Sequence, residues 1–240
     1  MNWEGCEMIA EEQGINMYNE GMLHSQLKQW YAKPNDRLES KVDGYIVDIV
    51  RDELLIEIQT ANFSAISKKL GKLVENHKVR LLYPVYLEKN IIKLSGTQDS
   101  VISKKKSPAK GTLADVFNEL IRIPHIIRQK NFSMEILFIK IDEYRCDDGK
   151  GSWRRKGASI IEKRLREVVA TKSLNCPQDY LCMLPNDIDQ PFTNKQLASK
   201  LNISIKKATK ITYCLKKMNV LHTAGKSGRS TLYRKLYLSD

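Results

Sequence analysis

The chain has 240 residues and is 42% hydrophobic, which is typical of a globular protein of one or two domains. It contains no apolar run of membrane-spanning length, and its first residues, MNWEGCEMIAEEQG, are acidic where a signal peptide is basic and apolar. We therefore expect a cytoplasmic protein without a membrane partner. The five cysteines form no CxxC pair and have no histidine at zinc-finger spacing, so they are predicted to be reduced thiols.

The formal net charge of +12 is concentrated at one end of the chain. Residues 190–240 contain 11 Lys or Arg and one acidic residue, a net charge of +10, whereas the other 189 residues contain 29 basic and 27 acidic residues, a net charge of +2. Such a localised positive charge is typical of a surface that binds a polyanion. We therefore expect the C-terminal segment to bind a polyanion.

The first hundred residues or so are predicted to alternate helices and strands, because helical and strand periodicities of apolar residues follow one another along the chain. The expected elements are a helix at 15–31, strands at 37–43, 45–50 and 54–58, a helix at 63–76, and strands at 79–87 and 90–94. This order suits an α/β layer with a mixed sheet.

Residues 95–175 are predicted to extend this layer. The expected elements are a polar surface loop at 95–111, a helix at 113–127 with a break at Pro124, a strand at 132–144 and a charged amphipathic helix at 158–174. The first domain would then cover residues 1–175, with a core at 15–95 and an extension at 113–175. Residues 176–190 contain two prolines and are predicted to be a linker.

A turn at 147–156, DDGKGSWRRK, places three cations beside a tryptophan. Arg154, Arg155 and Lys156 next to Trp153 suit the binding of a phosphate or the stacking of a base. A basic, solvent-exposed loop is the alternative interpretation. The two glycines do not form a phosphate-binding loop of a nucleotide hydrolase, because the GxxxxGK[ST] spacing is missing.

The predicted hairpin DGYIVDIVRDELLIEIQTAN, residues 43–62, carries three acceptor side chains in otherwise apolar strands: Asp48, Glu57 and Gln59. Glu57 and Gln59 point the same way because side chains alternate along a strand. With Asp48 on the neighbouring strand, two carboxylates and an amide can converge. Carboxylates repel each other and lose hydration in such a place unless a cation lies between them, so the pattern predicts a site for a hard divalent metal ion.

Residues 191–240 have the pattern of a winged helix-turn-helix domain. Thr193 is a predicted N-cap for a helix at 194–201, a turn follows at 202–204, a second helix at 205–218, and a hairpin has a basic tip at 225–229. In winged-helix domains, which this segment resembles, the second helix enters the major groove of DNA and the wing contacts the flanking phosphates. The alternative is a protein–protein module, but such modules seldom carry this density of positive charge.

The winged-helix resemblance implies a set of DNA contacts. The residues expected to make them are Lys206, Lys207, Thr209 and Lys210 on the second helix and Lys226 and Arg229 on the wing.

Residues 15–95 resemble the PD-(D/E)xK nuclease superfamily, the fold of restriction endonucleases and archaeal Holliday junction resolvases. The resemblance rests on the order helix, three strands, helix, strand, on Asp48 in the second strand, and on Glu57 and Gln59 in the third. A helix Glu upstream of the motif is frequent in that superfamily and corresponds here to Glu20, for which an ordinary glutamate near the N-terminus of a helix, favoured by the helix dipole, is the alternative. The implied fold is α/β, a restriction-endonuclease-like mixed sheet flanked by helices, followed by a small winged-helix domain.

Two positions depart from the superfamily pattern. Gln59 stands where a Lys is usual, and Val47 rather than Pro precedes the first acid. Lys69 or Lys72, on the following helix, are candidates to replace the missing cation. Asp43 competes with Asp48 for the role of metal-binding aspartate, and a role in the turn beside Gly44 is its alternative.

The resemblance implies hydrolysis of DNA phosphodiesters with Mg²⁺ or Mn²⁺ as cofactor. It implies that Asp48, Glu57 and the carbonyl of Ile58 hold the ion. Gln59 would orient the attacking water, and Glu20 is a further candidate catalytic residue.

The predicted protein is a metal-dependent DNA endonuclease directed to its target by the C-terminal module. The alternative is a non-catalytic DNA-binding regulator that uses an inactive nuclease-like domain for dimerisation or as a scaffold, an interpretation that Gln59 keeps open. RNA is a third choice, which the lack of an aromatic RNP motif disfavours. A homodimer would fit cleavage of both strands, because one active centre cuts one strand.

Overall fold

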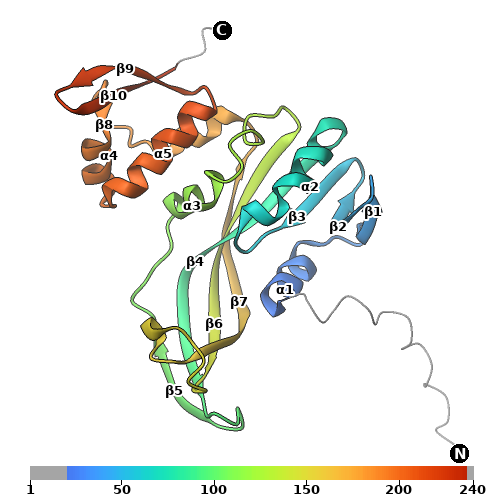
Figure 1. Cartoon of the computed structure of the whole chain (residues 1–240). Helices are drawn as coiled ribbons and strands as arrows, with labels where there is room; N and C mark the ends of the chain where they lie inside the picture. Colours follow the sequence, from blue (N-terminus) through green and yellow to red (C-terminus); the bar gives the residue numbers. More distant parts are fainter. Residues whose placement is uncertain (1–20, 237–240) are drawn as a thin grey trace, which may run out of the picture.

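The computed structural model describes residues 21–236, so Glu20 lies outside the described residues, as does the start of the helix predicted at 15–31. A large mixed sheet runs through the molecule, helices lie on both of its faces, and a smaller module packs at one end (Figure 1). No helix between residues 21 and 236 is both long enough and apolar enough to cross a membrane.

The described residues form a seven-stranded sheet of order β1-β2-β3-β4-β6-β7, with β5 also paired to β4. The strands are β1 (Arg37–Val42), β2 (Tyr45–Arg51), β3 (Leu54–Ile58), β4 (Lys78–Leu94), β5 (Val101–Lys106), β6 (Phe132–Cys146) and β7 (Ser159–Leu174). β3, β4 and β6 are parallel neighbours, and the other pairs are antiparallel. The predicted α/β mixed sheet is therefore confirmed.

Two apolar clusters hold helices against opposite faces of this sheet. Helix α1 (Met22–Tyr31) buries Leu23 and Leu27 against one face. Helix α2 (Phe63–Asn76), which connects the parallel strands β3 and β4, buries Phe63, Leu70, Leu73 and Val74 against the other. The helical spacing of these apolar residues is the reason that both helices could be predicted.

The helix predicted at 158–174 is wrong, because these residues form the long strand β7. They pair with β6 along their whole length, from Ser159 opposite Cys146 to Leu174 opposite Met134. Three register shifts interrupt this pairing and break the two-residue alternation of side chains that marks a strand in a sequence. β-branched pairs such as Ile160-Ile161 and Val168-Val169 nevertheless favour the extended conformation.

The polar loop predicted at 95–111 is wrong in part, because residues 101–106 form β5. This strand pairs with the end of β4, and all six of its residues are exposed. An exposed edge strand buries no side chains, so the sequence carries no apolar pattern to mark it.

The helix predicted at 113–127 is also mostly wrong. It is replaced by the 3₁₀ turn η1 (Leu113–Val116) and the four-residue helix α3 (Phe117–Leu120), and turns continue to residue 127. The apolar residues face inward as a helix would place them, but Pro124 disfavours the helical conformation in the residue before it.

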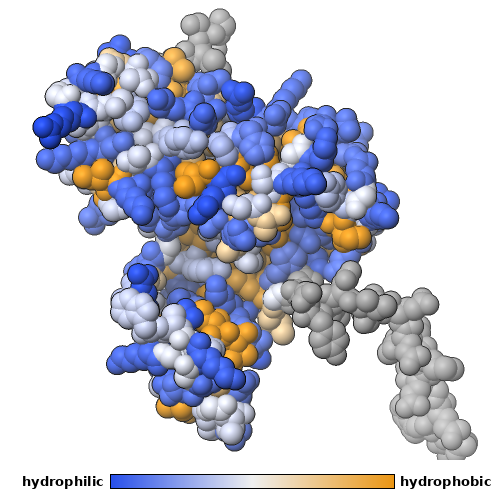
Figure 2. All heavy atoms as spheres, in the orientation of Figure 1, coloured by the Kyte–Doolittle hydropathy of each residue, from blue (hydrophilic) through white to orange (hydrophobic). Residues whose placement is uncertain are grey.

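The far halves of β4, β6 and β7 extend beyond the body of the molecule as an arm, which we define as residues 89–107 and 142–164 (Figures 1 and 2). Pairing between β4 and β6 is continuous from Val79–Phe132 in the body to Leu94–Cys146 in the arm, with one register shift between Tyr86 and Glu88. The two strands predicted at 79–87 and 90–94 are thus one strand. The arm is an extension of the core sheet and not a separate hairpin.

The C-terminal module, residues 192–235, contains two helices and a three-stranded sheet of order β8-β10-β9. Its elements are β8 (Phe192–Thr193), α4 (Asn194–Leu201), α5 (Ile205–Lys217), β9 (Leu221–Ser227) and β10 (Ser230–Lys235). The predicted cap is present, since the hydroxyl of Thr193 accepts a hydrogen bond from the amide of Gln196 at 3.2 Å. Both helices and the hairpin lie where the sequence placed them.

The prediction that residues 176–190 are a linker is wrong, because this segment is packed. It forms the 3₁₀ helix η3 (Pro177–Met183), and Tyr180, Leu184 and Ile188 are buried in the same apolar cluster as α2 and α5. The module therefore shares a continuous hydrophobic core with the large sheet.

Candidate functional site

The predicted acidic residues lie where strands β2 and β3 separate. The ladder between these strands runs from Arg51–Leu54 to Ile49–Ile56 and stops there. Asp48 and Glu57 are the next residue on each strand. β3 continues to pair with β4 on its other side through Glu57 and Ile58, so only the β2 side of β3 opens.

The side chain of Asp48 takes the place of the missing ladder bond. Its Oδ2 accepts a hydrogen bond from the amide of Ile58 at 2.8 Å and lies 3.2 Å from Nε2 of His24 on α1. The contact of Ile58 with this site is therefore made by its N–H group, and the expected role of its carbonyl as a metal ligand stays a prediction. Asp48 is thus held from two sides.

Glu57 is buried and faces α2. Only 4% of its side chain is exposed, and Nζ of Lys69 lies 2.6 Å from its carboxylate oxygens. Lys69 also donates to the carbonyl of Ile46 on β2, so it bridges the two separating strands. No described residue donates a hydrogen bond of good geometry to Oε1 of Glu57, which is buried.

The two carboxylates differ in acidity because their surroundings differ. Burial raises the pKa of Glu57, repulsion from Asp48 raises it further, and attraction to Lys69 only partly offsets both, so that it reaches about 7. For Asp48, burial also acts to raise the pKa, but the hydrogen bond and charge interaction with His24 and the amide of Ile58 outweigh it and hold the pKa below its usual range. The carboxyl group of Asp48 is therefore readily ionised, whereas that of Glu57 is costly to ionise.

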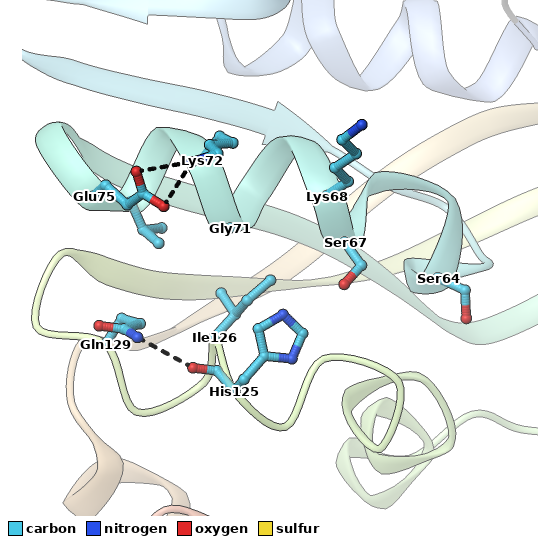
Figure 3. A pocket seen from close by; sticks show the side chains of 10 residues that line it. Ser64, Ser67, Lys68, Gly71, Lys72, Glu75, His125, Ile126 and Gln129 are labelled. Atoms are coloured by element: carbon cyan, nitrogen blue, oxygen red, sulfur yellow. Dashed lines mark hydrogen bonds and ion pairs between the residues drawn. The ribbon is translucent and has the colours of Figure 1, made fainter.

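Of the two lysines expected to replace the missing cation, Lys69 is the one that lies beside the acids. Lys72 contacts Glu75 at 3.2 Å on the outer surface of α2. It helps to line a groove of about 570 Å³ between α2 and residues 125–129, where Figure 3 shows Ser64, Ser67 and His125. Lys69 does not line this groove and faces Glu57 instead.

Two other sequence candidates lie apart from the pair of acids. The amide nitrogen of Gln59 donates to the carbonyl of Ala61, and the side chain is turned to the loop before α2. The Gln59 amide was expected to converge with Asp48 and Glu57, and among the described contacts it does not. Asp43 lies in the β1–β2 turn with a left-handed backbone conformation, which fits the turn role considered for it, and its carboxylate lies 2.9 Å from Nε2 of His77.

Sequence reasoning missed His24. It lies in α1 between Leu23 and Leu27, the two apolar residues that this helix buries against the sheet. A polar residue next to a buried apolar stripe is a weak signal, because such positions are usually solvent-exposed. Only the packing of α1 against the sheet shows that His24 reaches Asp48.

The residues present fit a magnesium or manganese ion better than a zinc ion. No group of three or more His, Cys, Asp or Glu residues within 21–236 is arranged to hold a metal. Mg²⁺ does not need such a group, since it is commonly bound through one or two carboxylates and several waters. Asp48 and Glu57 offer this donor set, and the buried Oε1 of Glu57, 2.6 Å from the ammonium of Lys69, accepts no hydrogen bond of good geometry from a described residue.

The C-terminal module carries a second set of predicted site residues, and its contacts divide them. Nζ of Lys207 contacts Asp115 in η1 at 2.6 Å, and Nζ of Lys210 contacts Asn118 in α3 at 2.7 Å. Both lysines were predicted to contact the major groove of DNA. Their side chains instead face the first domain and help to dock the module against it.

The remaining predicted contacts of the module are exposed. The exposed residues of α5 follow one stripe, the outer face of α5, which consists of Ile205, Lys206, Thr209, Tyr213, Lys216 and Lys217. Lys226 lies near the end of β9, and Arg229 lies in the β9–β10 turn. The hydrophilic surface of the module is visible in Figure 2.

The predicted basic turn lies on the arm. Trp153, Arg154 and Arg155 form the 3₁₀ turn η2, and Lys156 follows in a left-handed conformation. Arg154 and Lys156 are exposed, whereas Arg155 is partly buried and its Nε donates to the carbonyl of Ala158 at 3.0 Å.

Comparison with known proteins places the chain in a family. The profile of the family described as "Domain of unknown function (DUF8091)" matches residues 21–175, and the chain belongs to this family. A protein of Treponema pallidum (strain Nichols), described as an uncharacterized protein, is 27% identical over 223 residues, which cover 92% of this chain and 87% of that protein. The similarity to that relative therefore includes most of the C-terminal module. No solved structure matches the chain.

The raised pKa of Glu57 predicts a loss of stability as the pH rises. Its folded pKa of about 7 exceeds the ordinary value of 4.5, so the stabilisation is complete below pH 4.5 and is lost as the pH rises through 7. In EDTA, we expect the free energy of unfolding of the wild type, relative to Glu57→Gln, to fall by about 3 kcal/mol between pH 4.5 and pH 8. Urea denaturation at the two pH values measures this difference.

The control is Glu53→Gln, in the β2–β3 turn, where 87% of the side chain is exposed. This variant should follow the wild type within about 0.5 kcal/mol at both pH values. If the free energy of unfolding depends on pH equally in the wild type and in Glu57→Gln, the pKa of Glu57 is not raised in the folded protein.

Proposed function

We propose that this protein is a metal-dependent DNA endonuclease whose C-terminal module, a winged helix-turn-helix in this proposal, directs it to DNA. One observation carries the proposal: Asp48, Glu57 and Lys69 meet where β2 and β3 separate, and the carboxylate of Glu57 is buried there beside the ammonium of Lys69. Two acids and a lysine in this arrangement are the chemical groups that the PD-(D/E)xK resemblance requires, although the lysine comes from α2 and not from the third strand.

Asp48 and Glu57 are the residues that would hold Mg²⁺ or Mn²⁺. When bound, such an ion supplies a Lewis acid that activates water and offsets the charge that develops on the phosphate. The low pKa of Asp48 keeps a ligand ionised at neutral pH. A neighbouring cation is what favours the ionised form of Glu57, which is otherwise costly.

Lys69 supplies the positive charge that Gln59 does not. Its ammonium already lies 2.6 Å from Glu57 and is anchored to the carbonyl of Ile46, so it is preorganised beside the acids. A fixed ammonium can orient a water or a phosphate oxygen without reorganisation during the reaction. His24 acts on Asp48 and is a positioning residue in this proposal.

The DNA-binding part of the proposal rests on charge and exposure. The outer face of α5 presents Lys206, Thr209, Lys216 and Lys217, and the hairpin adds Lys226 and Arg229. Because Lys207 and Lys210 anchor the module to η1 and α3, the outer face has a fixed orientation relative to the sheet. Fixed orientation limits which duplex phosphates can reach the acidic site.

A second candidate function is a non-catalytic DNA-binding regulator. It is favoured by two contacts: Gln59 is turned away from the acids, and Lys69 already neutralises Glu57 without a metal ion. In that case the acidic pair would only stabilise the fold, and DNA binding would persist without cleavage.

Cleavage assays separate the two functions. Plasmid and oligonucleotide DNA are incubated with the purified protein in Mg²⁺, Mn²⁺ or EDTA, beside Asp48→Ala and Glu57→Ala. We expect nicking with the metals only, and a loss of at least about a hundredfold in both variants, because each removes a carboxylate that holds the charge at the reaction centre. Asp43→Ala, at the β1–β2 turn, is the matched control and should cut at the wild-type rate.

Absence of cleavage by the wild type with every metal and DNA form, combined with salt-sensitive duplex binding, would reject the nuclease and favour the regulator. Cleavage that survives in both acid variants would place the active centre elsewhere.

The two lysines of α2 offer a matched pair for testing the source of the cation. Lys69→Met, which keeps the length of the side chain and removes its charge, should lower the cleavage rate about a hundredfold with duplex affinity unchanged. Lys72→Met should leave the rate within about twofold, because Lys72 contacts Glu75 on the outer surface of α2. Equal rates for the two variants would show that Lys69 has no part in the reaction.

A further inference from the structure

The arm carries an aromatic side chain that the core of the protein does not use. Trp153, in the connection between β6 and β7, has 83% of its surface exposed, the highest value among the large exposed hydrophobic residues described. Exposed apolar residues that occur singly are common and carry no argument by themselves. The structure around Trp153 supplies the argument.

The turn that presents Trp153 is closed tightly by backbone hydrogen bonds. The amide of Gly151 donates to the carbonyl of Gly157 at 2.6 Å, and the amide of Lys156 donates to the carbonyl of Trp153 at 2.9 Å. Gly151 leaves no room for a side chain, because a Cβ there would lie 1.8 Å from the carbonyl oxygen of Ala158. Trp153 is therefore displayed by an ordered turn, which lowers the entropy lost when the ring binds a partner.

The turn is attached to a rigid support. β6 and β7 are paired up to Cys146 and Ser159, the residues that flank the connection, and Sγ of Cys146 contacts the carbonyl of Ser95 at 3.4 Å in the neighbouring β4–β5 turn. The ladder continues from these pairs into the body of the sheet. The position of Trp153 is thus set relative to the acidic site by continuous β-structure.

The charges beside Trp153 favour a polyanion. Arg154 lies with its guanidinium 5.5 Å from the centre of the Trp153 ring, and Lys150 and Lys156 are exposed in the same turn. The acids of the turn are engaged, since Asp147 contacts Lys93 at 2.6 Å and Asp148 accepts from the amide of Lys150 at 3.0 Å. β5, on the same arm, adds the exposed Lys104 and Lys105, whereas Lys106 is paired with Glu88.

We infer that Trp153 stacks on an unpaired base, so that the substrate is DNA with an unpaired segment next to a duplex. This inference rests on the proposed function and narrows its substrate class. Stacking on an aromatic side chain contributes about 1–3 kcal/mol per base, but only for a base whose face is free. Bases within a duplex are already stacked on their neighbours. Trp153 with its flanking cations therefore distinguishes branched, flapped or tailed DNA from a blunt duplex.

The test measures binding in EDTA, where cleavage cannot interfere. The probes are a blunt DNA duplex, the same duplex with a single-stranded DNA tail and the same duplex with an RNA tail. We expect the wild type to bind the DNA-tailed duplex about tenfold more tightly than the blunt one. Trp153→Ala should remove this preference and leave the affinity for the blunt duplex within about twofold, whereas Trp153→Phe should retain part of it.

Trp30→Ala is the matched control, because Trp30 is also exposed but lies on α1. It should keep the full preference for the tail. A 2-aminopurine at the first unpaired position gives a direct readout of stacking: its fluorescence should fall on binding the wild type and stay higher with Trp153→Ala at saturation.

Four results would overturn the inference. The first is an unchanged tail preference in Trp153→Ala, and the second is a preference for the RNA tail only. The third is equal binding of blunt and tailed duplex by the wild type, which would leave the proposed endonuclease intact as a duplex-binding protein. Failure to bind any of these probes would overturn both this inference and the DNA-binding part of the proposed function.

Discussion

The burial of Glu57 beside Asp48 is the constraint around which the first domain is built. A carboxylate with 4% exposure next to a second carboxylate needs a cation, and Lys69 of α2 provides one at 2.6 Å. This pairing holds the middle of α2 over the open edge of β3, while the Asp48–Ile58 hydrogen bond holds β2 against β3 where their ladder has ended. The same contacts assemble the candidate site and close the gap between the strands.

The remaining architecture gives this site a fixed frame. α1 and α2 pack on opposite faces of the sheet through apolar clusters, and each brings one polar side chain, His24 or Lys69, to the acids. β4 and β6 carry the frame outward into the arm, and the shared core around Tyr180 carries it to the C-terminal module. The candidate site, the arm and the C-terminal module are therefore connected by continuous sheet and core packing.

The sequence allowed prediction of those elements whose apolar residues follow a simple period. The hairpin, α2, α4 and α5 all bury one face, and the pattern of their residues shows it. The sequence of β7 favours a helix because three register shifts break the alternation of buried and exposed side chains. The sequence of β5 does not indicate a strand because none of its residues is buried. Tertiary pairing, which a local pattern does not contain, determines both strands.

Some residues of the candidate site could likewise be predicted from the sequence, and others required the fold. Asp48 and Glu57 could be found because carboxylates are rare within apolar strands, but the choice between Lys69 and Lys72 required the rotation of α2 about its axis. His24 required the packing of α1 against the sheet. Lys207 and Lys210 fit the pattern of a DNA-binding helix, and only the docking of the module shows that they face Asp115 and Asn118.

The most direct test of the account is to locate a bound metal ion. In a crystal grown with Mn²⁺, anomalous diffraction should show a peak coordinated by the carboxylates of Asp48 and Glu57, with the ammonium of Lys69 beside it. A map with no peak at this position, and with the Lys69–Glu57 ion pair unchanged at saturating Mn²⁺, would contradict the proposal that these acids form a metal-dependent active centre.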